Sequence, residues 1–144
     1  MLKKILGLFF ILSFPLYAGL SNAPTRGELN SNVNITMFGD YQCPFTQRGD
    51  ATINLLMKED KDFSFSMKQY PLSFHPMARY AAKAALCAGD SGKYWEMHDL
   101  LFKSPQSKMT EASINNLAMN LDLPKEIFAE CMKGQAQIRL LKEI

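Results

Sequence analysis

The chain has 144 residues, of which 47% are hydrophobic and 21% charged, and its formal net charge at pH 7 is +2. This length is enough for one modest domain with its own hydrophobic core. Because the charge is nearly balanced, it gives no long-range attraction to nucleic acid or to anionic lipid, and the sequence does not predict a protein of either binding class.

The N-terminus predicts an export signal. Two lysines at positions 3 and 4 precede an apolar run over residues 5–16, which is too short to span a bilayer comfortably. A signal peptide of residues 1–18 fits this pattern, cleavage after residue 23 is an alternative, and an uncleaved anchor is a third. Cleavage removes both lysines, so the net charge falls to zero. We therefore expect a periplasmic or otherwise exported protein, in a compartment where disulfides persist.

The segment after the signal predicts a strand, a helix and a second strand. Residues 19–31 are rich in Gly, Ser, Asn, Pro and Thr, which is typical of a flexible lead-in. Alternation predicts strands over residues 33–38 and 63–70, and Pro44 suits the first turn of a helix between them. This βαβ unit, residues 32–72, implies parallel strands with a right-handed crossover. One face of the helix should carry Phe45, Gly49, Thr52, Ile53 and Leu56.

Residues 73–144 predict a helical region. Its first helix is Ala-rich and stops at Gly89, Thr110 can cap a later helix, and Pro124 opens the next. The expected helices cover residues 76–88, 93–102, 110–121, 124–134 and 135–144. Two parallel strands make a poor sheet, because small sheets normally need three or more. We interpret this shortage as a sign that part of the fold is missing from the sequence.

The segment Cys43-Pro44-Phe45-Thr46 follows the first predicted strand and carries the chemistry. A cysteine at this junction lies at a helix N-terminus, whose open N–H groups favour the thiolate and make the sulfur nucleophilic. The usual form of this device has a second cysteine two residues after the proline, but this chain has Thr46 there. The hydroxyl of Thr46 can donate a hydrogen bond to the thiolate, yet it cannot resolve a mixed disulfide.

Other candidate residues allow a functional and a structural interpretation. Asp40, three residues before Cys43, either takes a proton or raises the thiol pKa by like charge, or else it caps the turn. His75 follows the second strand and is a candidate for approaching Cys43. His98 and Trp95 are interpreted as packing residues of an amphipathic helix. No pair of cysteines and histidines has ligand spacing, so no metal and no cofactor are expected.

Four stretches resemble the DsbA-like branch of the thioredoxin superfamily in their order and spacing. They are residues 37–45, Gln69-Tyr70-Pro71-Leu72, the Ala-rich helix to Cys87-Ala88, and residues 92–99. The resemblance implies an α/β, thioredoxin-like fold with a helical domain, residues 73–144, inserted after the second strand. It also implies exported thiol–disulfide oxidoreductase activity on protein thiols and on protein or small-molecule disulfides, with Cys43 as the attacking sulfur.

The chain departs from the DsbA-like pattern in two places. Thr46 replaces the resolving cysteine, and the closing strands with their cis-proline loop, which should begin after about residue 144, are expected to be missing. Cys87 and Cys131 lie on predicted helix faces, in regions where many relatives carry cysteines. We interpret them as a structural disulfide, with free core cysteines as the alternative. Cys43 is then the cysteine left over.

These features predict an exported, monothiol member of the DsbA-like family with impaired turnover. Release of its mixed disulfide would need an external thiol, with glutathione or a membrane redox partner as candidates. A non-catalytic binding or holdase module with the same fold is the second hypothesis, and an inactive truncated gene product is the third. Neither nucleic acid nor a metal ion is an expected partner.

Overall fold

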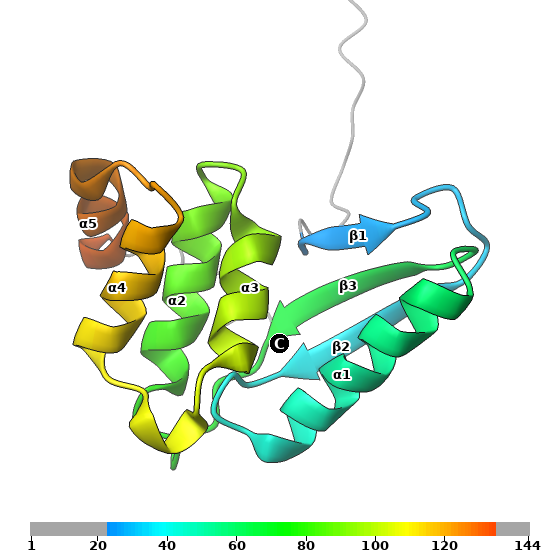
Figure 1. Ribbon diagram of the computed structural model, residues 1–144, viewed down its shortest axis with the longest axis horizontal. Coiled ribbons are helices and arrows are strands. Elements are labelled where there is room, and N and C mark those ends of the chain that lie inside the picture. Colours follow the sequence, from blue (N-terminus) through cyan, green and yellow to red (C-terminus); the bar gives the residue numbers. More distant parts are fainter. Residues whose placement is uncertain (1–22, 135–144) are drawn as a thin grey trace, which may run out of the picture.

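A computed structural model describes residues 23–134, and Figure 1 shows a small sheet beside a group of helices. The predicted signal peptide and the last predicted helix, over residues 135–144, lie outside the described residues. The sheet and its helix are β1 (Thr25–Gly27), β2 (Asn34–Gly39), α1 (Pro44–Glu59) and β3 (Ser64–Gln69). The helical region has α2 (Ala78–Gly89), α3 (Tyr94–Lys103), the short 3₁₀ helix η1 (Gln106–Lys108), α4 (Glu111–Asn120) and α5 (Lys125–Lys133).

The sheet has three strands in the order β1-β3-β2. β2 and β3 are parallel, with register from Asn34 opposite Ser64 to Gly39 opposite Gln69, which confirms the predicted βαβ unit. In Figure 1, α1 runs along β2, and helices α2 to α5 gather at the end of the sheet where β2 and β3 finish. The carboxyl ends of both parallel strands therefore point at the helical region, and the turn that holds Cys43 lies between the two parts.

The third strand corrects the expectation that residues 19–31 lack regular structure. β1 pairs antiparallel with β3, and Thr25 lies opposite Ser66. Just before the strand, the carbonyl of Pro24 accepts a hydrogen bond from the Met67 amide at 3.1 Å. The side chain of Trp95 in α3 also donates to the carbonyl of Thr25 at 3.3 Å. Three residues have too little local propensity to show as a strand in sequence, so the long-range pairing with β3 decides their conformation.

The burial of α1 also differs from its predicted face. Ile53 is buried, but Phe45 is 73% exposed and Leu56 is 40% exposed, while the acidic residue Asp50 is buried. A Cβ placed on Gly49 would lie 3.4 Å from the sulfur of Met37, which is an ordinary contact distance, so this position of α1 faces β2. The buried stripe of α1 therefore passes through a glycine and a hydrogen-bonded acid, which an analysis of apolar periodicity does not count.

The helical region follows its sequence signals. Thr110 and Ser113 form a reciprocal capping box at the start of α4, as the cap prediction requires. α3 buries all four side chains of its predicted face, which are Tyr94, His98, Leu101 and Phe102. Tyr94, Leu101 and Phe102 form one continuous core with alanines of α2 and with the fully buried Phe65 and Met67 of β3. The helical region is thus packed against the sheet end that carries the candidate site.

Candidate functional site

Cys43 is the N-cap residue of α1, directly before Pro44 at the first helical position. Its amide donates to the carbonyl of Asp40 at 3.0 Å, and its carbonyl accepts the first hydrogen bond of the helix, from Gln47 at 3.1 Å. The backbone of Cys43 is extended, with φ −83° and ψ 119°. The thiol is half-buried and is the free cysteine of the described residues. The sulfur therefore lies at the positive end of the helix dipole, where a thiolate is favoured.

Opposing effects act on the pKa of the Cys43 thiol. Burial raises this pKa, whereas interactions with the backbone and hydroxyl of Thr46 and with the backbone of Phe45 lower it. The negative charge of Asp40 raises it again. The hydrogen-bonding groups prevail, and the net pKa lies below the usual cysteine value. Residue 46, where a resolving cysteine is expected, thus supplies groups that stabilise the thiolate of Cys43.

Thr46 is fixed against the turn that precedes the helix. Its hydroxyl accepts a hydrogen bond from the Asp40 amide at 3.3 Å. A Cβ built on Gly39 would lie 2.5 Å from the methyl of Thr46 and 2.6 Å from the terminal methyl of Met67. These contacts leave no room for a side chain at residue 39, and they hold the Thr46 hydroxyl beside the N-terminus of α1.

Asp40 joins the turn to the segment that follows β3. The residue is only 3% exposed. One carboxylate oxygen accepts from the amide of Gln42 at 2.7 Å, and the other accepts from the amide of Leu72 at 3.0 Å. The second oxygen also bonds to Nδ1 of His75 at 2.6 Å. The structure therefore places Asp40 as a cap of the turn and as a like charge near Cys43, and it places His75 against Asp40.

A second buried group of polar side chains lies behind the turn. The Tyr41 hydroxyl bonds to Nδ1 of His98 at 3.0 Å, and Nε2 of His98 bonds to Asp50 at 2.9 Å. Tyr41 and His98 are both 0% exposed. His98 was predicted to be a packing residue of α3, and its helical spacing does not reveal the two hydrogen bonds. Asp50 had no sequence signal, because its partner is 48 residues away.

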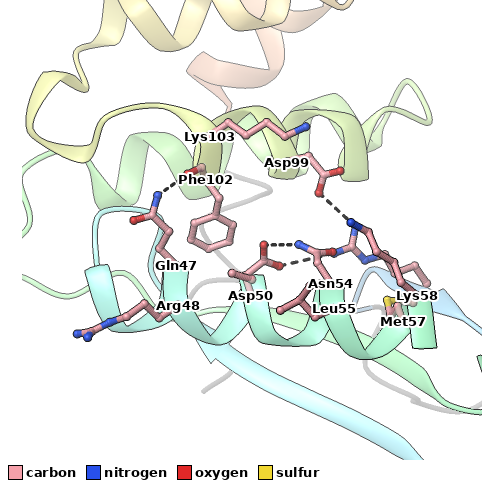
Figure 2. Close-up of a pocket in the computed structure, with 12 residues that line it drawn as sticks. Gln47, Arg48, Asp50, Asn54, Leu55, Met57, Lys58, Asp99, Phe102 and Lys103 are labelled. Atoms are coloured by element: carbon pink, nitrogen blue, oxygen red, sulfur yellow. Dashed lines mark hydrogen bonds and ion pairs between the residues drawn. The ribbon is translucent and has the colours of Figure 1, made fainter. Parts of the chain in front are cut away.

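An open cleft of about 920 Å³ lies between α1 and α3. Figure 2 shows Asp50 and Asn54 of α1 hydrogen-bonded to each other, and Gln47 reaching the carbonyl of Phe102 in α3, a contact of 2.6 Å. The cleft also has the basic residues Arg26, Arg48, Lys58 and Lys103 in its lining. The cleft adjoins α1, the helix that Cys43 caps, but the cysteine itself is not among the lining residues.

Cys87 and Cys131 lie in the helical region, away from the turn. The structure joins them by a disulfide that links α2 to α5, with their Cα atoms 5.8 Å apart. They therefore do not serve as a second thiol for Cys43.

The sequence and the fold identify the family. A sequence model described as Thioredoxin matches residues 20–144. The chain belongs to the thioredoxin family. Its fold is also similar to a thioredoxin-like oxidoreductase from Silicibacter pomeroyi, at 26% identity and TM-score 0.72, over 84% of this chain and 69% of that one.

Two further solved structures of thioredoxin-fold proteins share this architecture. The thiol-disulfide exchange protein alpha-DsbA2 from Wolbachia pipientis has 22% identity and TM-score 0.73, over 83% of this chain and 65% of that one. BdbD from Bacillus subtilis has 23% identity and TM-score 0.69, over 84% of this chain and 71% of that one. The resemblance to DsbA-like proteins and the α/β, thioredoxin-like fold class are thereby confirmed at the level of the fold.

Curated relatives match this thioredoxin-family chain over a small part of their own length. The Na(+)/H(+) antiporter NhaA 1 of Salinispora arenicola is 34% identical over 121 residues, which is 83% of this chain and 18% of the antiporter. NhaA 3 of Salinispora tropica is 31% identical over 106 residues, or 16% of that protein. The chain thus spans less than a fifth of either antiporter. Within residues 23–134, no helix combines the length and apolar character needed to cross a membrane.

Proposed function

We propose that this protein is an exported, monothiol thiol–disulfide exchange protein of the thioredoxin family, with Cys43 as its nucleophile. The observation that carries the proposal is a free cysteine at the N-terminus of α1 whose pKa lies below the usual value. Thr46 at the place of a resolving cysteine supports the single-thiol mechanism. The predicted signal peptide and the Cys87–Cys131 disulfide support export, because structural disulfides persist outside the cytosol.

The reaction consists of two exchanges that each conserve electrons. The Cys43 thiolate attacks one sulfur of a substrate disulfide, a new S–S bond forms, and the other substrate sulfur leaves as a thiolate. The protein then holds a mixed disulfide, which it cannot resolve itself, because residue 46 is a threonine and not a cysteine. An external thiolate attacks this bond and releases Cys43, while the substrate sulfur becomes disulfide-bonded to the external thiol. Glutathione, a thiol protein or a membrane redox partner are the candidate external thiols.

A non-catalytic binding module is the second candidate function, because large apolar side chains are exposed around the turn. Phe45 and Phe74 are 73% and 72% exposed, and Phe38 and Tyr70 are about half exposed. Phe45 is two residues after Cys43, and Phe74 precedes His75, which bonds to Asp40. Such a surface suits an apolar polypeptide segment whether or not a covalent bond forms.

Trapping of the mixed disulfide separates the two functions. The protein, with Cys43 as a free thiol, is mixed with a disulfide-bonded peptide. The mixture is quenched with acid and analysed by mass spectrometry without reductant. Exchange predicts an adduct on Cys43 that disappears on addition of glutathione and never forms in Cys43→Ser. Peptide binding by Cys43→Ser with the wild-type affinity, and no adduct in the wild type, would favour the binding module. Fractionation of cells that express the full chain, with and without residues 1–18, tests export.

A further inference from the structure

Three buried side chains are linked by hydrogen bonds and are here called the Tyr41–His98–Asp50 network. Tyr41 lies in the turn two residues before Cys43, His98 lies in α3, and Asp50 lies in the second turn of α1. The network therefore joins the reactive turn to α1 and α3. All three residues are at least nine-tenths buried.

The Asp50 carboxylate, at one end of the network, has partners in α1 and β1. It accepts from Nδ2 of Asn54 at 2.8 Å and lies 3.6 Å from the Arg26 guanidinium of β1. Arg26 also pairs with Asp99 at 3.2 Å and stacks over the ring of Trp95 at 4.4 Å. Figure 2 shows Asp50 and Asn54 pointing from α1 into the space that faces Asp99. The charge of Asp50 is thus held by fixed partners rather than by solvent.

The proton positions give the network a direction. A carboxylate only accepts hydrogen bonds, so Nε2 of His98 carries the hydrogen toward Asp50. In the neutral imidazole, Nδ1 is then the acceptor and the Tyr41 hydroxyl donates to it. Burial raises the pKa of Tyr41 well above its usual value, so this phenol keeps its proton.

The Tyr41 oxygen has two further partners, one at the end of β3 and one in α3. Nε2 of Gln69, at the end of β3, donates to it at 3.3 Å, and the Tyr94 hydroxyl lies 3.3 Å away. Movement of the turn away from α3 would break the buried hydrogen bonds of Tyr41 with His98 and Tyr94, which is costly in a site of low dielectric.

We propose that the Tyr41–His98–Asp50 network positions the reactive turn, so that the sulfur of Cys43 faces the amides and hydroxyl at the N-terminus of α1. Tyr41 and His98 are positioning residues in this scheme, since neither touches the sulfur. The inference rests on the proposed function, because it explains how the fold keeps a single thiol reactive. A merely structural network would contribute to folding alone and leave the reactivity of Cys43 unchanged.

The test compares the alkylation of Cys43 with thermal stability in the full chain. Tyr41→Phe keeps the ring and removes only the hydroxyl, and His98→Gln can keep the Asp50 contact while it loses Tyr41. Tyr80→Phe is the matched control, because its hydroxyl bonds to Asn115 in the helical region, outside the network. Iodoacetamide alkylation without reductant, followed over a pH series, reports the thiolate of Cys43, since Cys87 and Cys131 are bonded.

Positioning predicts that Tyr41→Phe and His98→Gln each raise the alkylation midpoint by about half a pH unit or more, which is about a threefold loss of thiolate at lower pH. Tyr80→Phe should keep the wild-type midpoint. If Tyr41→Phe and His98→Gln are folded and keep the wild-type midpoint, and that midpoint lies below the free-cysteine value, the positioning role is wrong and the proposed function stands. A wild-type midpoint at the free-cysteine value would instead refute the proposed function and, with it, this inference.

Discussion

The role of Thr46 can be tested by removing its hydroxyl and keeping its shape. Thr46→Val retains a methyl to pack against Gly39, but it removes the oxygen that lowers the pKa of Cys43. The amides of Thr46 and Phe45 remain in place. The variant therefore removes the interaction of the hydroxyl with the thiolate, together with the hydrogen bond that the hydroxyl accepts from the Asp40 amide.

The expected magnitude follows from the strength of a hydrogen bond to the thiolate. A hydrogen bond to a charged group contributes about 1.5–3 kcal/mol, and one pKa unit corresponds to about 1.4 kcal/mol. Because the sulfur is half-buried, solvent replaces part of the lost interaction. We expect the pKa of Cys43 to rise by about 0.5–1 unit in Thr46→Val, so alkylation below both midpoints slows by about three- to tenfold.

The assay measures the rate of iodoacetamide alkylation against pH, with two controls. Thr46→Ser keeps the hydroxyl and should keep a midpoint near that of the wild type. Thr52→Val makes the same substitution on an exposed position of α1, where the hydroxyl only bonds to the carbonyl of Arg48. If Thr46→Val and Thr52→Val have equal midpoints, the hydroxyl at residue 46 does not stabilise the thiolate and the reasoning is wrong.

Three further predictions concern stability. Removal of the disulfide in the Cys87→Ala, Cys131→Ala double variant should lower the free energy of unfolding by about 4 kcal/mol in the chain-entropy model, because the bond closes a loop of 44 residues; peptide mapping without reductant checks the pairing, and urea denaturation the loss. Gly39→Ala should destabilise the protein by about 1–3 kcal/mol, because the new Cβ clashes with Thr46 and Met67. Gly49→Ala has room for a Cβ in a helix and should stabilise the protein by about 0.5–1 kcal/mol. Equal effects of the two substitutions on urea denaturation would contradict the packing argument. The pKa of Cys43 is lower in the folded state, so the stability of the wild type relative to Cys43→Ser should rise as the pH passes from that lowered pKa to the usual cysteine value, and fall as the pH is lowered again; a flat difference in denaturation midpoints across this interval would count against a lowered pKa.

Elements whose signals are local could be predicted from the sequence. The alternation of β2 and β3 and the distance between them were enough to give a parallel pair, since the connection holds a full helix. The capping box at Thr110 and the buried face of α3 were likewise visible, because the residues involved are within one or two turns of each other. The helix start at Pro44 gave the position of Cys43 at an N-terminus for the same reason.

Features that depend on distant partners could not be predicted. β1 forms because β3 offers an edge about forty residues later, and three residues carry no periodicity of their own. Asp50 is buried because His98, Asn54 and Arg26 satisfy its carboxylate, and a pattern based on apolar residues assigns such an acid to the surface. A buried charge is tolerable only with its partners in place, and only the tertiary structure supplies them.

The proposed chemistry depends on two roles of residue 46, which are stabilising the thiolate of Cys43 and resolving the mixed disulfide. A residue three positions after Cys43, one helical turn away, can stabilise the thiolate through its amide and side chain, and a cysteine there can also resolve the mixed disulfide. Thr46 keeps the first role, because its backbone and hydroxyl lower the pKa of Cys43, and it lacks the second. Attack on a disulfide is then favoured by the protein itself, whereas release depends on an external thiol. On the proposed mechanism, turnover should therefore follow the concentration and pKa of that thiol, while adduct formation should not.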